Sequence, residues 1–132
     1  MVRFLALALP LALAACVETP VEVPPPGPAP VETYGIVSLD GARFPAKATI
    51  SFPKPGVAAG RAVCNRWSGT QTATPPAFRL RAVTTTEMAC NGMALEPVFL
   101  RALTEMTRID RLDNRIILSN GKGRTMVFRR QR

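Results

Sequence analysis

Three cysteines and a complete lack of histidine define the chemistry open to this 132-residue chain. Without histidine, Ser-His and Cys-His nucleophilic pairs, histidine metal sites and histidine proton shuttles are excluded. Residues 51–54 read Ser-Phe-Pro-Lys and match the Ser-x-x-Lys pattern of penicillin-binding enzymes, but that motif opens a helix, which Pro53 and Pro55 forbid here. Residues 121–123, Gly-Lys-Gly, are too short for a phosphate loop. The sequence therefore predicts no catalytic, cofactor-binding or metal site.

Cys16 ends a segment with the features of a lipoprotein signal peptide. Arg3 supplies a positive charge, residues 4–15 are mostly apolar, and small residues precede the thiol. A run of about 12 residues is too short to cross a bilayer, which needs ~20 helical residues. We expect residues 1–15 to be cleaved and Cys16 to carry at least two acyl chains, which anchor a protein stably. The alternative is an ordinary secretory signal with an incidental cysteine. Val17, in place of Asp, favours the periplasmic face of the outer membrane by resemblance to enterobacterial lipoproteins.

Cys64 and Cys90 remain as an even pair in an exported chain. An oxidising compartment favours a disulfide between them, and closing a loop of about 26 residues stabilises a fold by roughly 3.5 kcal/mol in the chain-entropy model. Two buried reduced thiols are the main alternative. A redox or metal role is a third, although redox pairs are usually spaced Cys-x-x-Cys and structural zinc needs four ligands.

The chain divides into a signal peptide, a tether and one domain. Residues 16–33 hold the expected lipidated cysteine and a stretch with six prolines, three glutamates and no basic residue. Proline runs favour an extended chain of ~3.1 Å per residue, so this tether could reach roughly 50 Å from the lipid. A proline motif that binds a partner domain is the alternative. Residues 34–132 suffice for one small domain.

The domain is predicted to be α+β. Alternating and turn-bounded segments predict antiparallel strands over residues 34–39, 47–52, 57–64, 78–83, 108–112, 115–119 and 124–129. Asn120-Gly121 predicts a type I′ hairpin turn. Apolar residues recur at helical spacing between Leu95 and Met106, and Pro97 fits only a first turn, so we expect a helix over residues 94–105.

Two motifs carry a resemblance to a known family. Residues 63–69 read Val-Cys-Asn-Arg-Trp-Ser-Gly, and residues 86–90 read Thr-Glu-Met-Ala-Cys. Together they resemble the META domain of HslJ-like bacterial lipoproteins over about residues 34–130, although Val63 and Glu87 replace the small residue and the arginine usual there. The matching motif positions are Asn65, Arg66, Trp67, Gly69, Thr86 and Met88. The resemblance implies a small antiparallel sheet curled into a partial barrel with one covering helix, and links to heat shock and novobiocin tolerance.

The motif residues are expected to have structural roles. Trp67 is large enough to plug a small core, and Asn65 suits a turn or a backbone cap. A ligand site lined by Asn65, Arg66 and Trp67 is the alternative. Arg66 could stack on an aromatic ring or pair with a carboxylate such as Glu87.

The domain is strongly basic, with 16 Lys and Arg against 6 Asp and Glu, whereas the tether carries only glutamates. In the cytosol such a surface would indicate nucleic acid. An exported protein instead meets anionic lipids, lipopolysaccharide phosphates or acidic polymers; a merely solvated face is the alternative.

We expect a monomeric, non-enzymatic envelope binding or stress-accessory module without cofactors, and possible envelope protein partners. The second hypothesis is an assembly partner, since META domains look like secretin-pilot lipoproteins, which hold an apolar peptide in a cracked barrel. The third is a thiol enzyme that uses Cys64 and Cys90.

Overall fold

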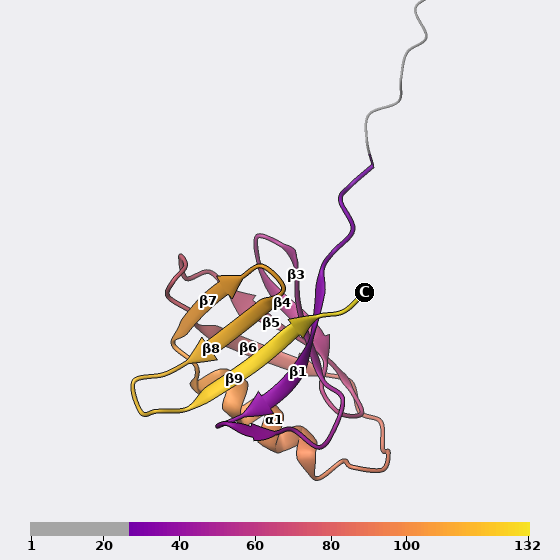
Figure 1. Ribbon diagram of the computed structural model, residues 1–132. Helices are drawn as coiled ribbons and strands as arrows, with labels where there is room; N and C mark the ends of the chain where they lie inside the picture. Colours follow the sequence, from indigo (N-terminus) through magenta and orange to yellow (C-terminus); the bar gives the residue numbers. More distant parts are fainter. Residues whose placement is uncertain (1–26) are drawn as a thin grey trace, which may run out of the picture.

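A single curled antiparallel sheet with one helix makes up the domain (Figure 1). The computed structural model describes residues 27–132. The sheet has the order β6-β5-β4-β3-β1-β9-β8-β7, and the short β2 pairs with β1 beside this path. The elements are β1 (Thr33–Leu39), β2 (Ala42–Arg43), β3 (Thr49–Lys54), β4 (Gly56–Arg61), β5 (Arg66–Gln71), β6 (Leu80–Thr85), α1 (Leu95–Glu105), β7 (Arg108–Leu112), β8 (Arg115–Ser119) and β9 (Thr125–Arg130). The predicted α+β class and partial barrel are confirmed.

The sheet curls until its two outer strands nearly meet. Just before β6, Phe78 N–H donates to the Thr107 carbonyl at 2.9 Å, and Ile109 N–H in β7 donates to the Pro76 carbonyl at 2.8 Å. Ala77 and Arg108 form an isolated antiparallel bridge between them. We call this contact the seam. It closes the barrel through a few residues only, because β6 and β7 share no ladder and the bridge involves Ala77, which precedes β6.

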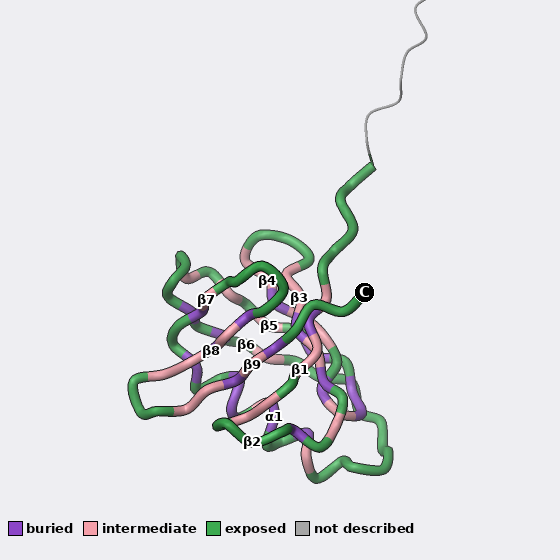
Figure 2. Tube along the Cα trace, in the orientation of Figure 1, coloured by how far each residue is buried: buried purple, intermediate pink, exposed green. Residues whose placement is uncertain are grey.

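Helix α1 closes one end of the barrel and supplies the centre of its core. Phe99, Ala102 and Leu103 point inward and are fully buried, in line with the predicted apolar stripe. The Phe99 ring has its centroid within 6.1–6.4 Å of the rings of Phe44, Trp67 and Phe128. Buried residues occur in every long strand, and the turn between β4 and β5 is mostly buried as well, whereas residues 27–32 are exposed (Figure 2). The helix therefore holds sheet strands from both halves of the chain.

Two strands were missing from the sequence-based expectation, the two-residue β2 and the longer β5. Residues 57–64 were expected to form a strand, but β4 ends at Arg61, residues 62–65 form a turn, and β5 returns alongside in full register from Gly56↔Gln71 to Arg61↔Arg66. Only Trp67 in β5 is a large apolar residue, so local alternation is weak. The hydrogen bonds to β4 and β6 on either side therefore stabilise β5 as a strand, although its own sequence has a weak strand propensity.

The β8–β9 hairpin is present, but not with the predicted turn. A type I′ turn would give Asn120 and Gly121 positive φ, whereas the positive angle falls at Gly123 (φ 83°). The Asn120 side-chain oxygen accepts the N–H groups of Lys122 and Arg124 at 2.9 and 3.1 Å, which shapes a longer loop. Asparagine stabilises this hairpin through its side chain rather than through its backbone angles.

The tether reaches the sheet at the end opposite the helix. Residues 27–32 lead away from the start of β1, at the end where β9 finishes (Figure 1). Glu32 holds this approach, since it accepts a hydrogen bond from the Tyr34 hydroxyl at 2.7 Å and pairs with Arg130 at 3.3 Å. No helix within residues 27–132 is long and apolar enough to cross a membrane. The predicted signal peptide and Cys16 lie outside the described residues.

Candidate functional site

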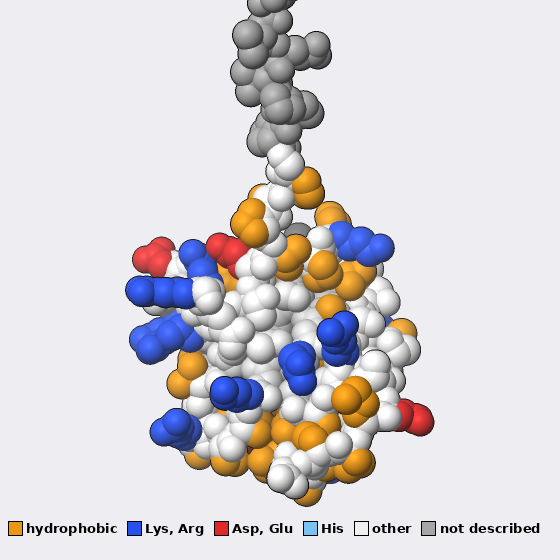
Figure 3. All heavy atoms as spheres, turned by 90° about the vertical axis from the view of Figure 1, so that its right-hand side faces the viewer, with side chains coloured by type: hydrophobic (Ala, Val, Ile, Leu, Met, Phe, Trp, Pro, Cys, Tyr) orange, Lys and Arg blue, Asp and Glu red, His pale blue; other side chains and the backbone are white. Residues whose placement is uncertain are grey.

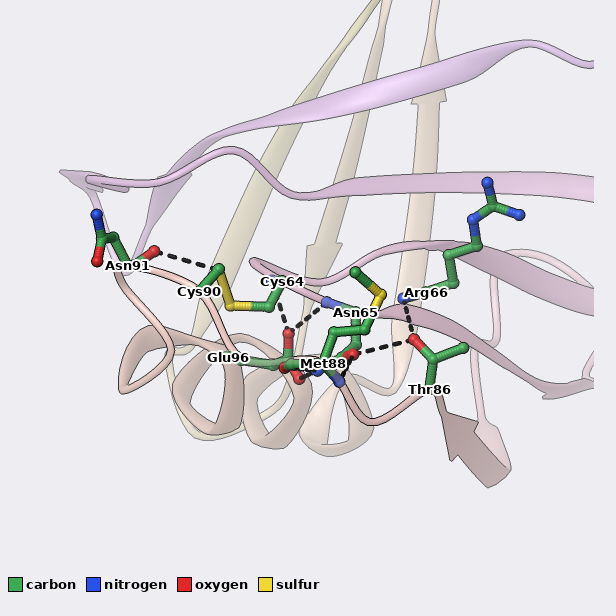
Figure 4. Close-up of a disulfide and its surroundings, with 8 residues drawn as sticks. All are labelled: Cys64, Asn65, Arg66, Thr86, Met88, Cys90, Asn91 and Glu96. Carbon is green, nitrogen blue, oxygen red and sulfur yellow. Dashed lines mark hydrogen bonds between the residues drawn. A yellow bond between two sulfur atoms is a disulfide. The ribbon is translucent and has the colours of Figure 1, made fainter.

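The buried carboxylate of Glu96 organises the turn between β4 and β5 (Figure 4). One oxygen, Oε2, accepts the backbone N–H groups of Cys64 and Asn65, each at 2.8 Å. The other, Oε1, accepts the Asn65 side-chain amide at 2.7 Å. Glu96 stands in the first turn of α1, where an acidic side chain also suits the helix dipole. The carboxylate therefore ties the helix start to the motif turn.

Asn65 connects the same turn to the second motif. Its side-chain oxygen accepts the Met88 N–H at 2.6 Å and the Thr86 hydroxyl at 3.0 Å, and its amide also donates to the Met88 carbonyl at 3.1 Å. Thr86 in turn accepts the Arg66 N–H at 3.1 Å. Asn65 is 4% exposed and uses both ends of its amide. The predicted capping role of Asn65 thus takes the form of a bridge between two segments more than twenty residues apart.

A disulfide joins the motif of residues 63–69 to the motif of residues 86–90. Cys64 and Cys90 are bonded, with their Cα atoms 5.7 Å apart. Cys64 is buried, whereas Cys90 lies in an exposed loop. The structure thus contains the disulfide favoured from the sequence, rather than two separate buried thiols. Together with Glu96 and Asn65, it fixes the loop after β6 against the β4–β5 turn and the helix start.

The other motif residues contribute packing and backbone contacts. Trp67 is 2% exposed, packs edge-on to Phe99, and donates its indole N–H to the Thr49 carbonyl at 3.1 Å. A Cβ on Gly69 would lie 2.7 Å from a Leu80 methyl carbon, so glycine allows β5 and β6 to approach. The Met88 side chain is 63% exposed, and only its backbone joins the network. These positions form a structural cluster. Arg66, Trp67 and Thr86 also line an open depression between β4, β5 and β6, which Asn65 does not reach.

Arg66 does not make the ion pair considered from the sequence. Its side chain is exposed on the outer face of β5, and within residues 27–132 it forms no ion pair with Glu87. The carboxylate that binds the residues of this turn is that of Glu96. The sequence analysis assigned no role to this residue. Its position directly before Pro97, at the start of an apolar helix, was the available signal. An acid there can serve backbone N–H groups of another segment as well as its own helix.

The environment of Glu96 favours its charged form. Burial of the carboxyl opposes ionisation, but the hydrogen bonds from the Asn65 side chain and from the backbone N–H groups of Asn65 and Cys64 outweigh it, so the pKa falls below its ordinary value of 4.5. A charged acceptor also makes each of these hydrogen bonds stronger than a neutral one. The network is consequently stable at neutral pH.

The outer surface carries many basic side chains without acidic partners. Within residues 27–132, ion pairs involve only Arg108, Arg124 and Arg130 among the cations. Arg124 binds both Asp40 and Glu105, and its hydrogen bond to Asp40 lowers the pKa of that carboxyl. On the face turned to the viewer in Figure 3, Lys and Arg side chains are spread over a largely uncharged surface with few carboxylates.

Two pairs of arginines stand directly opposite each other on neighbouring strands. Arg61 on β4 faces Arg66 on β5, and Arg115 on β8 faces Arg129 on β9. All four are exposed, and like charges in this position repel. Arg111 differs from the predicted outward array, because it pairs with the buried Ile116 and its guanidinium lies 4.3 Å from the centre of the Phe52 ring. That arginine covers the end of the barrel, where an aromatic face attracts it.

No group of three or more potential metal-ligating side chains occurs within residues 27–132. Candidate features for function in this part of the chain are the hydrogen-bonded cluster around Asn65 and Glu96 and the basic exterior.

Solved structures with the same architecture define the class of fold. One is an NMR structure of a protein from Burkholderia xenovorans, with a TM-score of 0.61 and 20% identity over 87% of this chain and 99% of the other. Another is the crystal structure of a DUF4847 family protein from Bacteroides vulgatus, with a TM-score of 0.57 and 16% identity over 74% of this chain and 90% of the other. At these identities the likeness concerns the fold alone. No curated protein matches the sequence.

The family model of the META domain matches residues 29–132, and the chain belongs to this family. The match spans every strand and the helix, and it includes both cysteine motifs. The family resemblance expected from the sequence is confirmed.

Proposed function

We propose that the protein is a lipid-anchored, non-enzymatic envelope lipoprotein whose META domain binds an anionic component of the outer membrane or periplasm. The observation that carries this proposal is the basic exterior, on which Arg115 and Arg129 stand directly opposite each other at the end where the tether enters. Repulsion between directly opposed cations is a cost to folding, and bound phosphate or carboxylate groups would turn it into attraction. Attraction at a negative surface amounts to about 1 kcal/mol per nearby basic residue.

The packing of α1 supports this proposal over a pilot for an apolar peptide. A peptide-holding pilot needs an apolar groove between helix and sheet, and here Phe99, Ala102 and Leu103 fill that space and are 0% exposed. The three aromatic contacts of Phe99 tie the helix to both halves of the sheet. The assembly-partner hypothesis would require the helix to move out of its core.

The disulfide supports a structural rather than a thiol-based role. A thiol enzyme needs a free sulfur with a lowered pKa, whereas Cys64 and Cys90 are bonded to each other, and Cys64 is buried. Their bond closes a loop that the Glu96 network already fixes.

Anchoring and binding are tested separately. Cys16→Ala in the full chain is expected to move the protein from the membrane fraction to the soluble fraction, with Cys90→Ala as a control that leaves the anchor in place. Continued sedimentation of the Cys16→Ala protein with membranes would refute lipid anchoring.

Binding is measured on residues 17–132. Every core side chain lies between Tyr34 and Phe128, so this form keeps the complete core. It is expected to bind lipopolysaccharide, an acidic polymer or anionic vesicles at low salt and to release them as salt rises. Absence of binding to all three at low salt would leave the basic exterior as a solvated face.

A further inference from the structure

We propose that the end of the barrel where the tether enters is a docking surface for the anionic phospholipid headgroups of a bilayer. The inference deepens the proposed function, since it assigns the membrane contact to one end of the domain. The protein would then stand on the membrane by this end, instead of being held away from it at the full length of its tether.

Strand register places the residues of this surface together. Thr33, where β1 begins, pairs with Ser51, three residues before Lys54 in β3, and Gly35 pairs with Arg129 near the end of β9. Arg129 also faces Arg115 at the start of β8, and Arg115 faces Leu112 at the end of β7. We define the tether-end surface as seven exposed residues of this end: Val31, Lys54, Arg111, Leu112, Arg115, Arg129 and Arg132.

The tether-end surface is positively charged and locally uncompensated. None of its five cations takes part in an ion pair within residues 27–132. Of the nearby carboxylates, Glu32 is engaged by Arg130, and Asp113 stands in the turn between β7 and β8. Five cations against these two acids give a surface complementary to phosphate headgroups.

Apolar side chains are interleaved with these cations. Leu112 is 55% exposed at the tip of the β7–β8 hairpin, and Val31 is 49% exposed on the approach of the tether. Figure 3 shows hydrophobic side chains around the point where the tether leaves the domain, with basic side chains on both sides and acidic side chains on the left. Apolar groups that enter the headgroup region and cations that meet the phosphates are the two parts of interfacial binding. Their proximity at one end distinguishes this surface from a merely solvated one.

Lys54 of β3 and Arg111 of β7 lie on one groove that could hold a lipid headgroup. Both line this open groove together with Phe52, Pro75 and Ile109. The Arg111 guanidinium lies over the Phe52 ring, which leaves its N–H edge available to a phosphate. The groove contains no acidic residue among those that line it. A phosphate group there would be met by both cations.

The direction of the chain agrees with this orientation. The residues that precede β1 leave the barrel at the tether-end surface (Figure 1), so an acyl anchor at Cys16 would hold this end nearest the lipid. The tether could reach roughly 50 Å when extended, but attraction at the surface would favour shorter arrangements.

Vesicle binding of residues 17–132 tests the surface with two matched variants. Arg115→Gln/Arg129→Gln removes one opposed arginine pair at the tether end, and Arg61→Gln/Arg66→Gln removes the other pair, beside the turn that packs on α1. Both change the net charge equally. On vesicles containing phosphatidylglycerol, the tether-end variant should bind on the order of tenfold more weakly, whereas the other should lose no more than about threefold. Leu112→Ser should also weaken binding, without any change in charge.

A second measurement reports orientation without mutation. With vesicles that carry spin-labelled headgroups, amide signals of the β7–β8 turn should broaden more than those of residues 62–65. Equal losses for both double variants, or broadening centred on residues 62–65, would overturn the inference while anionic binding itself remained. Binding to lipopolysaccharide or an acidic polymer but not to the vesicles would likewise leave only the proposed function. Absence of binding to all of them would remove both.

Discussion

Replacement of Glu96 by alanine is expected to lower the free energy of unfolding by about 3–5 kcal/mol. The carboxylate accepts three hydrogen bonds of 2.7–2.8 Å, and each hydrogen bond to a charged group contributes roughly 1.5–3 kcal/mol. The total is smaller than their sum because the Asn65 amide keeps its bond to the Met88 carbonyl. The N–H groups of Cys64 and Asn65 would be left buried without an acceptor.

Glutamine at the same position separates charge from shape. Glu96→Gln keeps one oxygen for the two backbone N–H groups but turns an NH₂ group toward the Asn65 amide, which is also a donor. We expect a loss of about 1.5–3 kcal/mol at pH 7. The matched control is Glu105→Gln on the same helix, which removes an exposed pair with Arg124 and should change stability by less than about 1 kcal/mol.

The pH dependence of this difference gives a further check. Because the pKa of Glu96 lies lower in the folded state than its ordinary 4.5, its contribution is complete above that value and disappears as the pH falls through the folded pKa. The stability gap between wild type and Glu96→Gln should therefore be largest near neutrality and shrink below pH 4.5.

Urea unfolding followed by Trp67 fluorescence measures both effects, since this is the one tryptophan of the chain and is 2% exposed. A Glu96→Gln protein as stable as the Glu105→Gln control, with a gap that does not vary with pH, would refute the assigned role of the carboxylate.

Two further predictions concern the disulfide and one close approach of strands. Reduction, or the Cys64→Ser/Cys90→Ser variant, should lower the unfolding free energy by about 3.5 kcal/mol, as measured in urea; a change below about 1 kcal/mol would show that the Glu96 network alone fixes the loop. Gly60→Ala should destabilise strongly, because its Cβ would overlap the Thr49 carbonyl, whereas Gly121→Ala meets open space. Thermal unfolding of the two glycine variants compares them, and equal midpoints would contradict the close packing of β3 on β4.

Patterns with a strong local signal were predictable, whereas long-range polar contacts were not. The apolar stripe predicted α1 to within one residue of its start, and the strands at residues 108–112 and 115–119 were predicted with their observed bounds. The strand β5 was missed because Trp67 is its one large apolar residue. Its sequence therefore lacks the alternation of apolar and polar residues that would have predicted a strand paired with β4 and β6. Glu96 was missed for a related reason, since its three donors lie more than thirty residues earlier in the chain.

The net charge of the domain was predictable from the sequence, whereas the positions of its arginines relative to one another were less so. Strand alternation indicated arginines on the outer face, and this is where Arg115 and Arg129 lie. It could not indicate that they face each other, because the register of β8 and β9 depends on the loop between them. Arg111 was wrongly placed on the outer face: it lies two residues after the buried Ile109 and pairs with the buried Ile116, so the alternation itself turns it inward, where it meets the Phe52 ring.

The seam has a consequence for how the molecule opens. A single antiparallel bridge, made by two backbone hydrogen bonds, joins the flanks of the barrel at this point, whereas the neighbouring long strands along the sheet path are joined by ladders. Thermal motion should open the seam first, which would expose the Phe78 ring beside the edges of β6 and β7, which have no other partner strand within residues 27–132. Such edges can exchange with those of another copy, so the lifetime of the closed join sets the resistance of the domain to self-association.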